Sequence, residues 1–307
     1  MSHRVGRAPY SVMLTPKGKL VTDLRVSRIE NGDQGDLLIE LPDPGVVGAL
    51  THLRKYLPPR LARLSELERP HSMLTLAGPA TPELLASRAE VGSELTPSVL
   101  MEAVEGDEWI VSGDSEIALR IIRSDDVGPL AFDIVGPSAD IDSLRAGLLQ
   151  SGATDGAPEL WEVLRLERGR PRFGAEMDED TMPAEAGIEG RCIDPTKGCY
   201  TGQEVVVRIR DRGHVNRHLR GVLLDEQSPP DIGTPLFLPR NDQAVGTIRS
   251  LVRSPRFDRM ISLAVVRREI QPLASLSVGS PRGPQGEVRA LSDLGWVLVE
   301  GDLSLYP

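Results

Sequence analysis

A strand–turn–helix pattern occurs twice in the middle of this chain. Residues 73–88 (MLTLAGPATPELLASR) and 131–148 (AFDIVGPSADIDSLRAGL) each read as an apolar strand, a Gly-Pro pair, a small residue and an amphipathic helix. A Ser or Thr close behind the Gly-Pro pair can cap the first free amides of a helix. Strand-like segments at 108–113 and 116–124 lie between the two copies. Two strand–helix units around two further strands indicate a ferredoxin-like α+β layer, and the alternative is a chance match of two short units.

The regions on either side of this layer have different patterns. Residues 12–29 predict two strands joined by a Pro/Gly turn, residues 31–36 a second turn, and apolar residues between 46 and 57 a helix. Residues 158–168 have the broad apolar face of another helix. From about residue 219, short strands alternate with Pro/Gly turns, which is typical of a small antiparallel barrel. We therefore predict three domains, made of residues 1–57 with 158–218, residues 58–157, and residues 219–307.

Charge and composition exclude several classes of protein. The 307 residues carry a net charge of -10, which argues against a general polyanion binder, so no direct contact with nucleic acid is expected. The N-terminal residues lack the apolar run of a signal peptide. The longest apolar stretches, such as residues 260–266, are too short to span a bilayer. Cys192 and Cys199 are the only cysteines, which is too few for a disulfide framework or for a four-ligand metal site. We therefore expect a protein of the reducing cytoplasm that binds no metal and has no contact with a membrane.

Cys199 lies in the segment DPTKGCYTGQEVVVR, residues 194–208. Thr201 and Glu204 fit a capping box and predict a short helix directly after the cysteine. A helix N-terminus and a nearby Lys197 would both favour the thiolate form of Cys199. Gly198 and Gly202 would allow another backbone or a ligand to approach closely. The alternative is that Cys199 is a buried small apolar residue.

An arginine-rich stretch follows at residues 208–220. One interpretation is a cradle for an anionic group, because the guanidinium fork suits carboxylates and phosphates. The other is a solvated turn that pairs with the acidic stretch at residues 176–189. The residues by themselves leave both interpretations open.

The eight residues KGCYTGQE at 197–204, followed by Arg208 and by RGHVNRHL at 212–219, resemble the signature of the YgfZ family. This family comprises folate-binding proteins, related to the T-protein aminomethyltransferase of glycine cleavage, that assist iron–sulfur cluster assembly or repair. Residues 14–26, 165–187, 245–255 and 261–269 also look like stretches of this family or of the T-protein. The resemblance covers nearly the whole chain and implies a T-protein-like α+β fold around a central cleft. The signature consists of Lys197, Gly198, Cys199, Tyr200, Gly202, Gln203 and Glu204.

The chain departs from the family pattern in two ways. Family members have some tens of residues before the early hairpin, and this chain begins almost at that hairpin. Either the start of the sequence is assigned incorrectly, or the first domain is shortened at its N-terminus and the folate cleft is partly open. The T-protein has two aspartates in the hairpin, one of them catalytic, whereas this chain reads Thr22-Asp23. A carboxylate there would assist chemistry at the folate nitrogen, so the threonine argues against aminomethyl transfer.

The resemblance also implies a set of site residues. Asp23, Glu176 and Glu185 would face the cleft, where a carboxylate can accept two donors from the amino-amide edge of a pterin, and Glu185 is the preferred reader. The alternative for each carboxylate is a hairpin or surface charge. Cys199 would be a reactive thiol at the cleft edge, acting as nucleophile, transient ligand or redox sensor. Candidates for binding the glutamate tail of folate are Arg208, Arg212 and Arg217.

Three functions follow as hypotheses. The first is a folate-binding accessory factor, with tetrahydrofolate or a derivative as its cofactor, that supports iron–sulfur proteins or their assembly machinery and affects tRNA modification indirectly. The second is a tetrahydrofolate-dependent one-carbon transferase of the aminomethyltransferase type. The third is a structural binding module in which Cys199 is buried and inert. Two cysteines cannot supply the four thiolates of a stable four-cysteine cluster.

Overall fold

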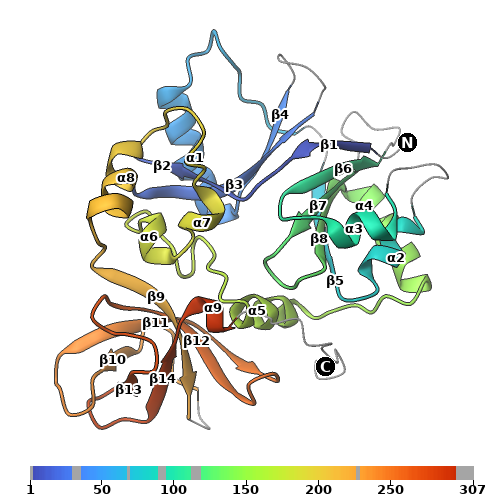
Figure 1. Ribbon diagram of the computed structural model, residues 1–307. Helices are drawn as coiled ribbons and strands as arrows, with labels where there is room; N and C mark the ends of the chain where they lie inside the picture. Colours follow the sequence, from blue (N-terminus) through green and yellow to red (C-terminus); the bar gives the residue numbers. More distant parts are fainter. Residues whose placement is uncertain are drawn as a thin grey trace. The chain divides into compact units, whose positions relative to one another are not determined.

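The computed structural model describes residues 3–29, 36–67, 70–88, 95–111, 119–225 and 229–294 (Figure 1). The chain divides into two compact units. The first contains residues 1–10, 25–40 and 53–157, and the second contains residues 11–24, 41–52 and 158–307. Strand β3 (Leu20–Arg28) and helix α1 (Asp43–Tyr56) each run from one unit into the other. The predicted turn at 31–36 lies, except for Asp36, outside the described residues.

The first unit is built on a five-stranded antiparallel sheet with the order β1-β6-β7-β8-β5. The helices of this unit are α2 (Thr81–Ala86), α3 (Pro97–Glu102) and α4 (Ser138–Gln150). Its core contains Trp109 and Phe132, whose ring centroids lie 6.3 Å apart, together with buried leucines and isoleucines from strands and helices. The strands are β1 (His3–Arg7), β5 (His71–Ala77), β6 (Asp107–Val111), β7 (Leu119–Ser124) and β8 (Ala131–Pro137).

The predicted repeat is present as β5 with α2 and β8 with α4. The two repeated strands pair directly with each other, from His71 opposite Pro137 to Ala77 opposite Ala131. The two intervening strands, β6 and β7, extend the sheet beyond β8 instead of lying between the two copies. Two polar pairs accompany this register: Thr75 donates to Asp133 at 2.7 Å, and the hydroxyls of Ser72 and Ser138 lie 2.7 Å apart.

Strand β4 (Leu37–Glu40) pairs with the second half of β3 within the first unit. Arg25 fixes this hairpin to the sheet, because its guanidinium contacts Asp133 on β8 at 2.6 Å and Glu40 on β4 at 2.9 Å. All three side chains are largely buried, so this is a low-dielectric ion cluster in which each charge depends on its partner.

The second unit contains the early hairpin, a group of short helices and a closed barrel. Strand β2 (Ser11–Leu14) pairs with the first half of β3, and the turn between them is closed by the amide of Gly18 donating to the carbonyl of Thr15 at 2.9 Å. This hairpin and the helix at residues 43–56 agree with the predictions. The remaining helices are α5 (Pro158–Glu167), α6 (Pro183–Ala186), α7 (Glu189–Cys192), α8 (Gln203–Arg212) and α9 (Leu291–Leu294).

The barrel is closed and antiparallel, with the strand order β10-β11-β12-β9-β14-β13. It confirms the barrel predicted from residue 219 onward, and helix α5 packs on its outside through a cluster that includes Leu166, Leu219 and Leu263. The division into three domains stays a prediction, and the barrel shares its compact unit with residues 158–218. The strands are β9 (Arg217–Leu224), β10 (Pro235–Phe237), β11 (Ala244–Ser254), β12 (Arg259–Arg267), β13 (Ser275–Val278) and β14 (Gln285–Arg289).

Candidate functional site

Glu185 lies at the centre of the candidate site. It belongs to the short helix α6, which runs from Pro183 to Ala186 and is followed by the C-cap Gly187 in the left-handed conformation, with φ of 70°. The Glu185 carboxylate turns back on its own helix, and its Oε2 accepts from the amide of Met182 at 3.0 Å. Arg217, at the start of β9, donates from Nε to Oε1 at 3.1 Å and from Nη2 to Oε2 at 3.3 Å. The Glu185 side chain is 12% exposed and that of Arg217 is 48% exposed.

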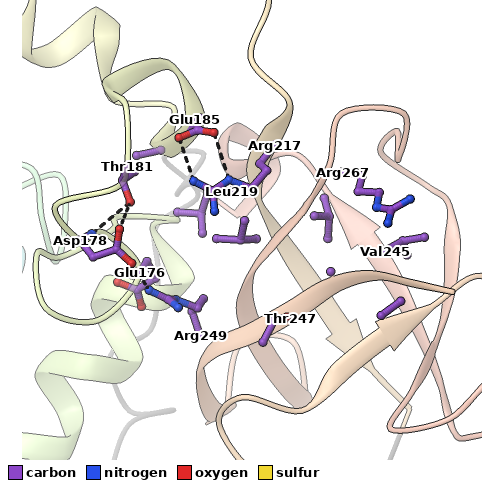
Figure 2. Close-up of a pocket in the computed structure, with 15 residues that line it drawn as sticks. Glu176, Asp178, Thr181, Glu185, Arg217, Leu219, Val245, Thr247, Arg249 and Arg267 are labelled. Carbon is purple, nitrogen blue, oxygen red and sulfur yellow. Dashed lines mark hydrogen bonds and ion pairs between the residues drawn. The ribbon is translucent and has the colours of Figure 1, made fainter. Parts of the chain in front are cut away.

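Two cavities of the second unit meet at this ion pair. The first has a volume of about 290 Å³ and lies between the 176–186 segment and barrel strands β9, β11 and β12 (Figure 2). The second has a volume of about 520 Å³ and lies between the same segment and helix α8. Glu185 and Arg217 line both cavities. The other ionisable side chains that line them are Glu176, Asp178, Arg249 and Arg267 in the first and Lys19, Asp180, Arg208 and His214 in the second.

Asp178 and Arg249 form a second ion pair in the first cavity, at 2.9 Å (Figure 2). Burial alone would raise the pKa of Asp178, but hydrogen bonds from the Thr181 hydroxyl, the Asp180 amide and Arg249 outweigh it, so that the pKa is lowered. This carboxylate therefore stays ionised and ties the loop to strand β11.

Glu176 is also at the first cavity, but its carboxylate is fully engaged by its own chain. Arg165 donates to both oxygens, at 3.0 and 3.1 Å, and the Arg172 amide donates to Oε2 at 2.9 Å. The side chain of Glu176 is completely buried. Its predicted contact with a pterin stays a prediction, and the geometry gives it a structural role between α5 and the following loop.

Asp23 and Thr22 lie on β3 and are not among the residues that line the two cavities. Both are buried, Asp23 with 8% exposure and Thr22 with none. The Thr22 hydroxyl donates to the carbonyl of Asp23 at 2.9 Å. Thr22 also packs directly on α1: a methyl group on Gly45 would lie 2.0 Å from its hydroxyl oxygen. The role of Asp23 as a folate contact stays a prediction.

The predicted helix after Cys199 is confirmed as α8, but the predicted capping box is wrong. Gly202, not Thr201, is the N-cap, and it has the left-handed φ of 83°. The reason is a close approach of the early hairpin: a methyl group on Gly202 would lie 2.6 Å from the carbonyl oxygen of Thr15. Gly18 is the corresponding glycine on the hairpin side of this contact. Its φ is 72°, and Val205 of α8 lies next to it. The signature motif and the TPKG turn are thus packed together.

At Gly198 a methyl group would extend into open space, so no other described part of the chain approaches this glycine, and the approach of a ligand there stays a prediction. Cys199 itself is exposed, which contradicts the alternative that it is a buried core residue. The amine of Lys197 lies 4.8 Å from the centroid of the Tyr200 ring. Cys192, by contrast, is half-buried, and burial together with Glu189 raises its pKa to about 12. Cys199 is therefore the accessible thiol, and its chemical role stays a prediction.

The three predicted anion-binding arginines have different surroundings. Arg208 lines the second cavity and has no ion pair within the described part of the chain, whereas its neighbour Lys19 is paired with Asp180 at 2.6 Å. Arg212 ends α8 and lines neither cavity. Arg217 is paired with Glu185, and this hydrogen bond raises the pKa of Arg217. Both interpretations of the arginine-rich stretch thus find support, since one arginine pairs with the acidic segment and another faces a cavity unpaired.

Several residues that line the cavities have no individual signal in the sequence. Lys19, Asp178, Asp180, Arg249 and Arg267 line the cavities, but they lie in stretches whose patterns predict only a hairpin, a loop or a barrel. Periodicity places residues on strands and does not say which strand ends meet. Among the residues described, no cluster of three or more potential metal ligands occurs. No described helix is long and apolar enough to cross a membrane.

The comparisons with known proteins agree with this architecture. The profile of the GCVT N-terminal domain family matches residues 1–195. The aminomethyltransferase of Exiguobacterium sibiricum is 25% identical to this chain over 265 residues, which cover 86% of this chain and 69% of the relative. The aminomethyltransferase of Rubrobacter xylanophilus is 27% identical over 270 residues, which cover 87% of this chain and 68% of the relative. The glycine cleavage system aminomethyltransferase T of Bartonella henselae has a similar structure, with a TM-score of 0.74 at 20% identity, covering 94% of this chain and 76% of that one. The chain therefore belongs to the GCVT N-terminal domain family and has the T-protein aminomethyltransferase-like fold.

Proposed function

We propose that this protein binds tetrahydrofolate, or a derivative of it, and transfers a one-carbon unit as a T-protein-like transferase. The observation that carries the proposal is the Glu185 carboxylate, which lies where two cavities meet and is oriented by the amide of Met182. A fixed carboxylate suits the amino-amide edge of a pterin, which presents N–H donors. The aminomethyltransferase relatives support a folate as the source of that edge.

The charges around the cavities support an anionic group on the same ligand. In the second cavity Lys19 and Arg217 are paired with Asp180 and Glu185, whereas Arg208 has no ion pair with any described residue. A guanidinium that keeps no intramolecular partner can pair with a carboxylate of a ligand at little cost. We propose that Arg208 binds the glutamate tail of folate, with Arg212 one helical turn farther along α8.

A calorimetric titration of tetrahydrofolate tests the binding. We expect the wild-type protein to bind and Glu185→Gln to lose most of its affinity, because the amide replaces one acceptor by a donor. Glu159→Gln is the matched control, since Glu159 is exposed at the start of α5 and lines neither cavity. Equal binding by the Glu185 and Glu159 variants, or no binding by any form of the protein, would count against the proposal.

Product analysis then tests the transfer. The protein should form methylenetetrahydrofolate from an aminomethyl or methylamine donor. Asp23 is the carboxylate that this chain keeps where the T-protein hairpin has two aspartates, and it would assist the chemistry at the folate nitrogen. Asp23→Asn should reduce turnover more than it reduces folate affinity. Absence of the product with every candidate donor would remove the transferase activity and leave a folate-binding protein without turnover.

A second candidate function is the YgfZ-like one, and two observations favour it. Cys199 is exposed within the signature segment, and Thr22 is packed against α1 where the T-protein has an aspartate. In this reading the protein is a cytoplasmic folate-binding accessory factor for iron–sulfur cluster assembly or repair, and it affects tRNA modification through a cluster-containing enzyme. Its expected partners are iron–sulfur proteins or their assembly machinery.

Complementation separates the two candidates. In a strain that lacks its own family member, this protein should restore the activity of cluster-containing enzymes, and Cys199→Ser should not. Rescue by wild type without any transferase activity would favour the accessory function. Failure to rescue, together with product formation in vitro, would favour the transferase.

A further inference from the structure

The hydrogen-bonding capacity of Glu185 is almost used up in the structure. A carboxylate offers about four lone-pair positions, two on each oxygen. Oε2 accepts from the Met182 amide at 3.0 Å and from Arg217 Nη2 at 3.3 Å, and Oε1 accepts from Arg217 Nε at 3.1 Å. One position on Oε1 is left. A ligand edge with two parallel N–H donors needs one position on each oxygen, so it cannot bind while Arg217 stays in place.

Arg217 presents to Glu185 the same type of edge as such a ligand, namely two parallel N–H donors. Its Nε–H and Nη2–H point in parallel at the two carboxylate oxygens, which is the fork geometry of the guanidinium. A 2-amino-4-oxopyrimidine ring, as in a pterin, presents a ring N–H and an exocyclic amino group side by side in a similar arrangement. The arginine side chain therefore occupies the place that such a head group would take.

The contact between the two side chains is loose enough for exchange. Charge-assisted N–H···O bonds are usually about 2.7–2.9 Å long, and both bonds from Arg217 to Glu185 are longer. Arg217 is half-exposed, and its further contact, from Nη2 to the carbonyl of Asp180, is long at 3.5 Å. Glu185, in contrast, is nearly buried and is also held by its own helix. Arg217 borders the cavity of about 520 Å³, which provides space for its side chain to move. The carboxylate is thus the fixed partner and the guanidinium the mobile one.

We propose that Arg217 competes with the ligand for the carboxylate of Glu185 and thereby determines which ligands bind. A head group with two parallel N–H donors displaces it from Glu185, and the released guanidinium pairs with an anionic group on the same ligand. A ligand that has only one of these two features binds weakly. It breaks the ion pair but provides a new partner for only one of its two members, Glu185 or Arg217. This inference rests on the proposed function, in that Glu185 is taken to read a pterin.

Two probes separate the two roles of Arg217. One is 6-methyltetrahydropterin, which has the donor edge but no anionic tail, and the other is tetrahydrofolate, which has both. Each is titrated calorimetrically into the wild-type protein, Arg217→Met, Glu185→Gln and the control Arg253→Met. Arg253 is an exposed barrel arginine in an ion pair with Asp258 and lines neither cavity, so it matches the substitution and the type of interaction.

We expect Arg217→Met to bind 6-methyltetrahydropterin roughly two- to fivefold more tightly than the wild type, the range set by loss of a partly exposed ion pair. The gain should be smaller for tetrahydrofolate, because the variant also loses a cation for the tail. Arg217→Lys keeps the charge but not the fork and should lie between wild type and Arg217→Met. Arg253→Met should equal the wild type. Circular dichroism and thermal melting establish that each variant is folded.

Weaker or unchanged binding of the pterin by folded Arg217→Met and Arg217→Lys would overturn the inference and make Arg217 a residue that positions Glu185. That result would leave the proposed function standing as long as Glu185→Gln abolishes binding. Equal binding by Glu185→Gln and wild type would instead remove the proposed function itself. Binding by Arg217→Met alone, with none by the wild type, would support both.

Discussion

At the scale of single residues, the function of this protein depends on which charges its own side chains neutralise. Glu176 and Glu185 look alike in the sequence, since both belong to the acidic segment before the signature. In the structure Arg165 and the Arg172 amide hold the buried Glu176, whereas Glu185 is held by the Met182 amide and by the half-exposed Arg217. The first carboxylate is a structural element, and the second can exchange its partner.

Gly202 shows how one residue of the signature serves the fold. Its left-handed φ of 83° and the nearby carbonyl of Thr15 leave no space for a side chain. We expect Gly202→Ala to reduce the free energy of unfolding by about 2–4 kcal/mol, from backbone strain and the contact with Thr15. Gly198→Ala is the control, since that position is open, and its effect should stay within about 0.5 kcal/mol. Urea unfolding followed by circular dichroism measures both, and equal effects would contradict this account.

At the scale of elements, tertiary contacts decided two features against local preference. Helix α8 runs through Val205, Val206 and Val207, although β-branched residues disfavour a helix, because Val206 is buried and the helix is amphipathic. The helix was predicted from the sequence, but its start was not, because the close approach of the early hairpin requires glycine at the N-cap. The register of the repeated strands β5 and β8 likewise depends on pairing between distant segments.

The β3–β4 hairpin contains a carboxylate whose ionisation is opposed by the fold. Glu40 is buried, which raises its pKa, and the attraction of Arg25 offsets this only in part. Glu40 Oε1 has no hydrogen-bond partner among the described residues. Because the folded protein holds the Glu40 proton more tightly than the unfolded chain does, stability should fall as the pH rises from about 4.5 through the raised pKa of Glu40.

Glu40→Gln should remove this part of the pH dependence and leave stability at pH 7 equal to or above that of the wild type. The glutamine carbonyl can still accept from Arg25, Arg25 keeps Asp133 as its counter-ion, and one charge fewer has to be buried. Thermal melting between pH 4 and pH 8 measures the slope, with Glu102→Gln on the exposed face of α3 as control. A slope that is unchanged in Glu40→Gln would show that other groups cause it.

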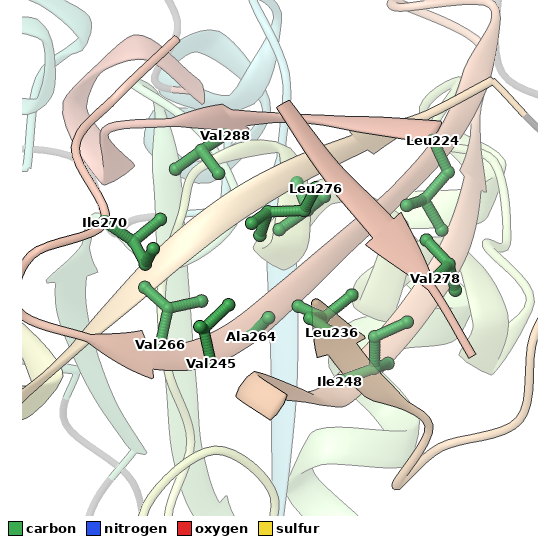
Figure 3. Close-up of a cluster of buried hydrophobic side chains, with 11 residues drawn as sticks. Leu224, Leu236, Val245, Ile248, Ala264, Val266, Ile270, Leu276, Val278 and Val288 are labelled. Atoms are coloured by element: carbon green, nitrogen blue, oxygen red, sulfur yellow. The ribbon is translucent and has the colours of Figure 1, made fainter. Parts of the chain in front are cut away.

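At the scale of the whole molecule, each compact unit has its own hydrophobic core. The barrel core consists of aliphatic side chains from all six strands, with Leu276 and Ile248 fully buried (Figure 3). The first unit is built around Trp109, Phe132 and Ile134. Because each core is closed within its own unit, a cavity made in one should act first on that unit.

We expect Leu276→Ala and Phe132→Ala each to destabilise by about 2–5 kcal/mol, the usual cost of a large cavity in a core. In differential scanning calorimetry Leu276→Ala should lower a transition that belongs to the second unit, and Phe132→Ala one that belongs to the first. Displacement of a single shared transition by both variants would show that β3 and α1 couple the two units into one cooperative structure.

The sequence by itself determined the fold class and much of the local structure. Hydrophobic periodicity located the early hairpin, helices α1 and α5, the repeated strand–helix units and the barrel, because these patterns arise from the side-chain spacing of helices and strands. The motif around Cys199 led to the aminomethyltransferase-related family and to Glu185. It did not reveal that Gly202 is the N-cap of α8.

Only the tertiary structure decided what the site residues do. It brought Lys19 of the hairpin, Glu185 of α6 and Arg217 of the barrel to the second cavity, although they are distant in the chain. It also enclosed Glu176 in an ion pair, packed Thr22 against Gly45 and left Cys199 exposed. The physical reason is that hydrogen-bond capacity and burial are properties of three-dimensional neighbours, and a linear pattern specifies neighbours only within one helix or strand.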